Sequence, residues 1–274
     1  MSECTHDCST CGESCSERKE QQSFLKPMNE RSNIKRVIGV VSGKGGVGKS
    51  LVTCLLASKC QKAGLKAGVL DADVTGPSVP KSFGITSRAL QDDKGLLPTV
   101  TDSGIKMMSI NLLLEDVNAP VVWRGPVISG VIQQFWTDVA WGELDYLFVD
   151  MPPGTGDVAL TVFQSLPVDG IVIVSTPQDL VKMIVNKAYN MAEMMNVPVL
   201  GLIENMSYFI CPNCNEKHSI FGKSQIDETA AELNLPVLAK LPIDQQNAAL
   251  VDDGRVEDIE APELDDFVNA LNIF

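Results

Sequence analysis

The chain has 274 residues, a length that suits one large α/β domain or two small ones and needs no metal or disulfide to hold its core. Hydrophobic residues make up 45% and charged residues 21%, which excludes wholesale disorder, and no apolar run approaches the roughly 20 residues that span a bilayer. Acidic residues outnumber basic ones by 35 to 22, for a net charge of −13, so neither a nucleic-acid nor a membrane partner is expected.

The first 33 residues differ in composition from the rest of the chain. They are rich in cysteine and then in charged and polar residues, without helical or strand periodicity. This composition predicts either a flexible tail or a small segment folded around a metal ion, which precedes a domain at 34–274. The tail starts with acids and thiols and lacks the features of a signal peptide, so we expect a cytoplasmic protein whose eight cysteines are thiols or metal ligands.

From Val37 onward, apolar strand-like runs alternate with helical stretches. The expected strands are 37–41, 69–70, 105–110, 146–149, 171–174, 199–203 and 237–241. The expected helices are 50–63, 127–139, 180–195, 224–233 and 262–271. Segments 81–104 and 111–125 are weakly patterned and are predicted to form loops. The alternation of strands with helices predicts an α/β fold with a doubly wound, mostly parallel sheet. Because the strand-like runs are apolar throughout, helices are expected on both faces of this sheet.

A glycine-rich loop lies between the first strand and the first helix. Its sequence, Gly43-Lys44-Gly45-Gly46-Val47-Gly48-Lys49-Ser50, fits the G-x-x-x-x-G-K-[ST] pattern in the required context. Glycines let backbone N–H groups surround phosphate oxygens, and the helix turns its positive end to the same anion. Lys49 is expected to contact the β- and γ-phosphates and Ser50 to bind Mg²⁺. Lys44 either points to solvent or adds positive charge near the transferring phosphoryl group.

Acidic residues follow two further strands. Asp71 and Asp73 come at the end of the second strand, where a carboxylate holds Mg²⁺-bound water or orients the attacking water. Asp150 ends the run 146–149 and is predicted to lie near Mg²⁺. The proline- and glycine-rich segment 152–157 is expected to be a stiff loop that senses a γ-phosphate.

With these motifs the chain resembles the deviant-loop P-loop NTPases, which include the nitrogenase iron protein and the division-site and plasmid-partition ATPases. Within that class it is similar to the Mrp/ApbC family of ATP-dependent iron–sulfur cluster carriers, over about residues 36–254. The resemblance implies that Lys44 reaches the nucleotide of a second subunit, that Asn205 contacts adenine, and that Asp73, with Asp71 as second choice, orients water. The matching strings are 70–78, 123–126, 141–146, 150–157, 176–179, 204–207 and 211–214.

Cys211 and Cys214 form a C-x-x-C pair, which is half of a four-thiolate site. Pairing of two identical chains supplies the other half, which favours a [4Fe–4S] cluster that bridges a homodimer, as the family resemblance also implies. Two alternatives remain at this point: a zinc site with His218 as third ligand, and a redox or inert cysteine pair.

Four more cysteines lie close together in the tail. Their C-x₃-C-x₂-C-x₃-C spacing supplies four thiolates from one chain, for a cluster, for zinc, or for metal held only loosely. The spacing is shorter than that of the four-cysteine tails in the wider family. The four residues are Cys4, Cys8, Cys11 and Cys15. Cys54 and Cys60, by contrast, lie in an apolar helix and are expected to be buried.

Together these features predict a homodimeric carrier that uses ATP and Mg²⁺ and delivers a [4Fe–4S] cluster to apo-proteins. One alternative is a partition- or positioning-type ATPase, against which the acidic segment 262–267 argues, because it offers neither a basic DNA-binding surface nor a membrane-binding helix. A second alternative is an electron-transfer or scaffold protein in which nucleotide only stabilises the dimer.

Overall fold

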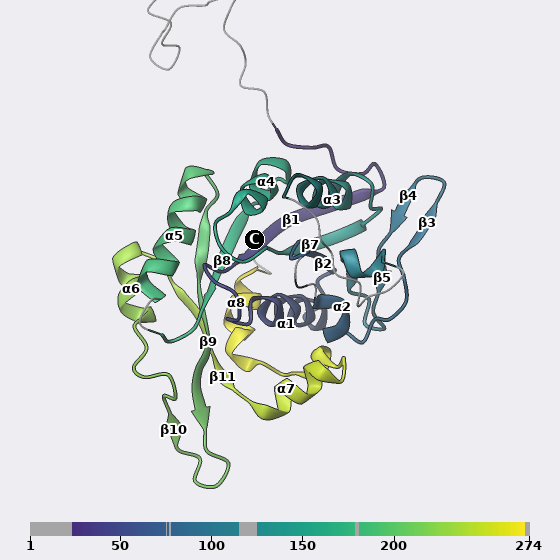
Figure 1. The fold of residues 1–274 in the computed structure, drawn as a ribbon. Coiled ribbons are helices and arrows are strands. Elements are labelled where there is room, and N and C mark those ends of the chain that lie inside the picture. Colours follow the sequence, from purple (N-terminus) through teal and green to yellow (C-terminus); the bar gives the residue numbers. More distant parts are fainter. Residues whose placement is uncertain (1–23, 75, 77, 115–124, 179–180, 272–274) are drawn as a thin grey trace, which may run out of the picture.

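The protein is built around one central sheet (Figure 1). The computed structural model describes residues 24–74, 76, 78–114, 125–178 and 181–271. Within these ranges the sheet has nine strands, in the order β10-β9-β8-β1-β7-β2-β6-β5, with β11 also paired to β9. The strands are β1 (Ser32–Val41), β2 (Ala67–Asp71), β5 (Thr99–Val100), β6 (Lys106–Met108), β7 (Gly142–Asp150), β8 (Gly170–Ser175), β9 (Val199–Ile210), β10 (Lys217–His218) and β11 (Val237–Ile243).

The middle of the sheet is parallel, and the antiparallel pairs are those of β5 with β6 and of β10 with β9. Because parallel strands end at the same edge, the loops that follow β1, β2 and β7 meet there. A separate two-stranded hairpin consists of β3 (Leu90–Asp92) and β4 (Gly95–Leu97).

Helices cover both faces of the sheet, as Figure 1 shows, with α3 and α4 on one side and α1 and α8 on the other. Along β1, Val37 and Val41 pack into one apolar cluster, and Ile38 and Val40 pack into the other. This alternation, with both faces buried, explains the continuous apolar runs of the sequence. The helices are α1 (Lys49–Lys62), α2 (Val79–Ser82), α3 (Gly125–Thr137), α4 (Asp157–Ser165), α5 (Val181–Met194), α6 (Ile226–Leu233), α7 (Gln245–Asp252) and α8 (Asp265–Leu271).

The predicted doubly wound α/β architecture is confirmed, and each expected strand and helix is found. Most of their ends are shifted by up to five residues, and β9 runs seven residues past the expected end at 203. Residues 1–23 of the predicted tail lie outside the described residues. The last two residues that were assigned to the tail, 32 and 33, belong to β1. Among the described helices, none is long and apolar enough to cross a membrane.

Several elements were missed. Segment 81–104, predicted as a loop, contains the β3–β4 hairpin and β5, whose strands are two or three residues long and too short for a periodic pattern. α7 buries no side chain, so no apolar stripe marks it. The predicted stiff loop 152–157 ends where α4 begins, and Ala159, Val162 and Phe163 of α4 are buried at helical spacing, a pattern that the sequence did offer.

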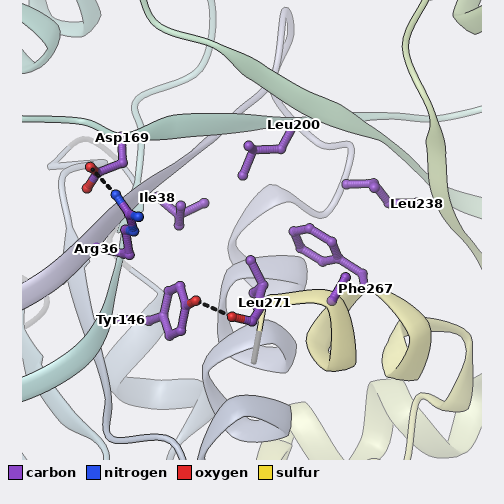
Figure 2. Close-up of a pocket in the computed structure, with 9 residues that line it drawn as sticks. Arg36, Ile38, Tyr146, Asp169, Leu200, Leu238, Phe267 and Leu271 are labelled. Atoms are coloured by element: carbon purple, nitrogen blue, oxygen red, sulfur yellow. Dashed lines mark hydrogen bonds and ion pairs between the residues drawn. The ribbon is translucent and has the colours of Figure 1, made fainter. Parts of the chain in front are cut away.

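The C-terminal helix packs beside α1 on one face of the sheet, near the edge where the strands begin. α8 packs Phe267, Val268 and Leu271 against the core, and the hydroxyl of Tyr146 on β7 donates a hydrogen bond of 2.5 Å to the carbonyl oxygen of Leu271 (Figure 2). A mostly apolar cavity of about 370 Å³ lies beside this contact, with the Arg36–Asp169 ion pair at its wall. These residues stand at the opposite edge of the sheet from the loop that follows β1.

Candidate functional site

The glycine-rich loop forms one wall of a cavity of about 340 Å³ at the edge where the parallel strands end. Ser42 follows β1 and is buried; its hydroxyl donates to the carbonyl oxygen of Lys44 at 3.0 Å, and its own carbonyl accepts from the N–H of Gly154 at 2.8 Å. The structure thus brings the predicted loop of 43–50 against the proline-rich loop after β7. Pro153 and Asp73 line the same cavity.

Asn205 forms a hydrogen bond to the end of the glycine-rich loop. Its side-chain amide donates to the carbonyl oxygen of Val47 at 2.9 Å, and Asn205 is buried. Gly48 has a φ of 80°, and a Cβ atom there would lie 2.1 Å from Asn205 Nδ2. The position therefore requires glycine both for its backbone conformation and for space. This bond to Val47 is a role of Asn205 that the sequence did not suggest.

Asn205 also lines a second cavity, of about 280 Å³, with Met206, Pro242 and Asp244. Leu51, at the start of α1, borders both this cavity and the one along the glycine-rich loop. A nucleotide whose phosphates lie in the loop would therefore find space for its base beside Asn205. This arrangement is compatible with the adenine contact that the family resemblance implies.

Lys49 is buried among carboxylates. Its ammonium nitrogen lies 2.7 Å from Asp150 Oδ1 and 3.6 Å from Asp73 Oδ2. Asp150 is fully buried at the end of β7, and its position is fixed by the parallel register that pairs it with Asp71 on β2. The residues predicted from three separate segments thus meet in one site. A buried ion pair of this kind needs further hydrogen bonds to offset the loss of hydration.

Two hydroxyl groups of α1 supply those bonds. Ser50 Oγ donates to Asp150 Oδ2 at 2.6 Å, and Thr53 Oγ1 donates to Asp150 Oδ1 at 2.9 Å. Mg²⁺ prefers oxygen ligands such as hydroxyls and carboxylates, so Ser50, Asp150 and the neighbouring Asp73 fit this ion. Thr53 was not predicted, although it lies one helical turn after Lys49, on the same face of α1.

Asp71 and Asp73, the two candidates for orienting water, have different surroundings. Asp71 is fully buried and accepts hydrogen bonds from Ser109 Oγ at 3.0 Å and from the N–H of Asp73 at 3.2 Å. Burial first, and then the charge of Asp150, raise the pKa of Asp71 well above its ordinary value. Asp73 borders the cavity and Asp71 does not, so the geometry favours Asp73 for contact with water or ligand.

Lys44, earlier in the loop, has a different partner from Lys49. Its ammonium group contacts the side-chain oxygen of Gln178, which follows β8, at the protein surface. Lys44 is therefore not directed at the Asp150 carboxylate. This placement is compatible with the implied reach of Lys44 towards a second subunit.

Cys211 and Cys214 lie in the turn that joins β9 to β10. One ligand atom each of Cys211, Cys214 and His218 lies within 4.8 Å of the others. The N–H groups of Asn213 and Cys214 donate to the sulfur of Cys211, and these bonds hold the pKa of that thiol below its ordinary value. The cluster alternative and the zinc alternative therefore share one prearranged cysteine pair.

The remaining cysteines fall into two groups. Cys54 and Cys60 are buried in α1, as predicted; burial raises the pKa of Cys60 to about 12 and also raises that of Cys54. Such thiols are poor metal ligands because the thiolate is the ligand form. Cys4, Cys8, Cys11 and Cys15 lie outside the described residues, so their metal site stays a prediction.

One strand joins the two sites. Asn205, next to the glycine-rich loop, and Cys211, in the metal-ligand turn, are separated by the second half of β9. Glu204 on this strand is fully buried and accepts hydrogen bonds from Ser207 Oγ at 2.5 Å and Ser224 Oγ at 2.7 Å. Ser224 belongs to the segment that returns from β10 to α6. Both ends of the cysteine-bearing hairpin are thus tied to the residue beside Asn205.

Comparison with known proteins identifies the family. A model of the NUBPL iron-transfer P-loop NTPase family matches residues 33–272. An iron–sulfur cluster carrier protein of Methanocaldococcus jannaschii is 47% identical over 250 residues, which are 89% of this chain and 86% of that protein.

Solved structures agree with this assignment. A nucleotide-binding protein from Archaeoglobus fulgidus, in complex with ADP and with cobalt found, is 47% identical, with a TM-score of 0.77 over 86% of this chain and 92% of that one. The MinD cell division protein of Aquifex aeolicus, at 18% identity, a TM-score of 0.57 and coverage of 87% and 95%, shares the fold alone. The resemblance found in the motifs is confirmed: the chain belongs to the NUBPL iron-transfer P-loop NTPase family.

Proposed function

We propose that this protein is an ATP-dependent carrier that binds a [4Fe–4S] cluster between two copies of the chain and transfers it to apo-proteins in the cytoplasm. The strongest support for this proposal comes from strand β9. Asn205 of β9 lies beside the phosphate loop, and Cys211, only six residues later, begins the cysteine turn. A nucleotide site and half of a cluster site thus share one structural element. The name of the Methanocaldococcus relative, iron–sulfur cluster carrier protein, supports the same cargo.

At the nucleotide site, each residue has a proposed task. The backbone of residues 43–48 surrounds the phosphates, Lys49 neutralises their outer oxygens, and Ser50 and Asp150 hold Mg²⁺. Mg²⁺ withdraws charge from the phosphate oxygens when bound. Asp73 faces the cavity and orients the attacking water. Lys44 contributes its charge to the nucleotide of the partner chain.

At the cysteine turn, the cargo needs four thiolates. One chain presents Cys211 and Cys214, so two copies related by two-fold symmetry complete the set. Ile210, Ile220 and Phe221 near this turn are exposed apolar residues that a second copy would cover. A cluster held across such an interface becomes accessible when the two chains move apart, which suits transfer.

Nucleotide and cluster are coupled in this proposal through β9. Binding of the base beside Asn205 changes the position of that side chain, and Glu204, through its bonds to Ser207 and Ser224, passes the change to both ends of the hairpin. The affinity of the cysteine turn for the cluster then differs between nucleotide states. Hydrolysis resets the protein.

The ATPase proposal is tested by release of phosphate from ATP by the purified full chain. We expect Lys49→Ala to abolish hydrolysis, and Lys44→Ala to reduce it most at protein concentrations where dimers form. Lys35→Ala is the matched control, because Lys35 is an exposed lysine at the start of β1 that pairs with Asp145, on the opposite edge of the sheet. Unchanged hydrolysis in Lys49→Ala would contradict the proposed site.

The carrier proposal is tested by anaerobic cluster reconstitution. A variant with Cys211→Ser and Cys214→Ser is compared with one in which Cys4, Cys8, Cys11 and Cys15 are all changed to Ser. We expect the first variant to lose the transferable cluster and the dimer that depends on it, and the second to keep both. Iron and sulfide counts, sedimentation and activation of an apo-acceptor give the readouts. Undiminished transfer by the first variant would refute the proposal.

A further inference from the structure

The hairpin formed by β9 and β10 brings a histidine next to the two cysteines. The antiparallel register pairs His218 with Phe209 and Lys217 with Ile210. Since residues two apart in a strand face the same side, His218 shares a face with Glu216, whose carbonyl accepts the N–H of Cys211 at 3.0 Å. Lys217 takes the opposite face, where its ammonium nitrogen lies 3.6 Å from the centroid of the Tyr208 ring. The register thus places the imidazole, and not the ammonium group, beside the thiols.

The turn itself is prearranged for a ligand. The N–H of Asn215 donates to the carbonyl oxygen of Cys211 at 2.8 Å, and Asn215 has a left-handed φ of 58°. The N–H groups of Asn213 and Cys214 point at the sulfur of Cys211. These bonds fix the position of the Cys211 sulfur, and the side chain of Cys214 also hydrogen-bonds to it, so the two thiols lie side by side.

We propose that Cys211, Cys214 and His218 of a single chain form a site for one divalent transition-metal ion of the zinc type, with a fourth position open to water or another ligand. The site shares two thiolates with the proposed cluster but does not depend on it. It needs one chain, whereas the bridging cluster needs two.

The donor set matches the chemistry of this ion. Two thiolates and a neutral imidazole suit Zn²⁺, which takes sulfur and nitrogen ligands in a tetrahedral arrangement. Bonds of about 2.3 Å to sulfur and 2.0 Å to nitrogen put tetrahedral ligand atoms about 3.5–3.8 Å apart. The three ligand atoms lie within 4.8 Å of one another, so shifts of about 1 Å on binding close the site. Two thiol protons leave as the ion binds, and the complex is neutral.

The cysteine turn then has a second state, in which it holds a single ion. An ion held by one chain occupies both thiols, so that chain cannot supply them to a bridging cluster. The His218 imidazole is about half-exposed, and the ion is therefore open to exchange with chelators or with an incoming ligand. Zinc and the cluster exclude each other at this turn, and the histidine favours the single-chain state.

The test is a Zn²⁺ titration of the reduced full chain against a chromophoric chelator. Cys4, Cys8, Cys11 and Cys15 are all changed to Ser so that the tail takes up no metal. In this background, His218→Ala is compared with Lys217→Ala, a neighbour on the same short strand whose side chain faces away. We expect one zinc per chain, an affinity at least about tenfold weaker in His218→Ala, and a change under about threefold in Lys217→Ala.

X-ray absorption at the zinc edge gives a second readout. We expect two sulfur ligands at about 2.3 Å and the outer scattering of one imidazole, which His218→Ala removes. Equal affinity and equal spectra with and without the histidine would overturn the proposal, and so would one zinc per two chains with four sulfur ligands. Iron content of the Cys211→Ser, Cys214→Ser variant tests the cluster separately, so the two proposals fail independently.

Discussion

Gly48→Ala tests how the phosphate loop is held. The new Cβ would lie 2.1 Å from Asn205 Nδ2, so Asn205 must move by more than 1 Å and give up its 2.9 Å bond to the carbonyl of Val47. A lost bond at a buried group costs about 1–3 kcal/mol, and a φ of 80° costs alanine about 1–2 kcal/mol more. We expect the free energy of unfolding to fall by about 2–5 kcal/mol.

Urea unfolding of a double-mutant cycle separates these two costs. Asn205→Ala alone is expected to cost about 1–3 kcal/mol, through the unsatisfied Val47 carbonyl. In the double variant that bond is lost only once, so the combined cost should fall short of the sum by about 1–3 kcal/mol. Gly45→Ala is the control: Gly45 is exposed, its Cβ would meet nothing within 4 Å, and we expect a change of less than about 1 kcal/mol. Additive costs in the cycle would refute the steric argument.

Three further predictions concern the buried polar groups. Lys49→Met leaves the carboxylate of Asp150 buried without its cation, and we expect urea unfolding to show a loss of about 3–5 kcal/mol; a loss below about 1 kcal/mol would contradict this. Tyr146→Phe removes the bond to the carbonyl of Leu271, at the far edge of the sheet from the nucleotide, so stability should fall by about 1–2 kcal/mol while ATP hydrolysis is unchanged. Burial and the charge of Asp150 raise the pKa of Asp71, so this side chain takes up a proton when the protein folds. The free energy of unfolding should therefore fall as the pH rises from the ordinary carboxyl pKa to the raised pKa. Asp71→Asn should remove that fall in urea transitions measured over a pH series, and an unaltered pH dependence would count against this prediction.

The features that could be predicted from the sequence are those encoded locally. The spacing of residues 43–50 marks the phosphate loop, and apolar runs mark the central strands, because each is a pattern within a few residues. Asp150 was placed near the phosphate loop because parallel strands end at one edge, but its ion pair with Lys49 was not predicted. Cys54 and Cys60 were correctly expected to be buried.

What could not be predicted depends on contacts between distant residues. The fit of Asn205 against Gly48 joins positions 157 residues apart and leaves no mark in either segment. Met194 of α5 is apolar and yet 79% exposed, because the buried side chains of this helix, such as Val185, Ala188 and Ala192, lie on another face. α7 is a different case, because it buries no side chain and its one signal is local: the carboxylate of Asp244 caps it by accepting from the N–H groups of Gln246 and Asn247.

The long strand β9 has a mechanical consequence. It runs past the body of the protein into the β9–β10 hairpin, which projects from the lower part of the sheet in Figure 1. The six residue steps from Asn205 to Cys211 make an arm of at most roughly 20 Å. A tilt of about 5° at the inner end therefore swings the sulfur atoms by about 1.7 Å, roughly three quarters of a metal–sulfur bond length. Small adjustments around a bound base are thus amplified where two chains would have to meet.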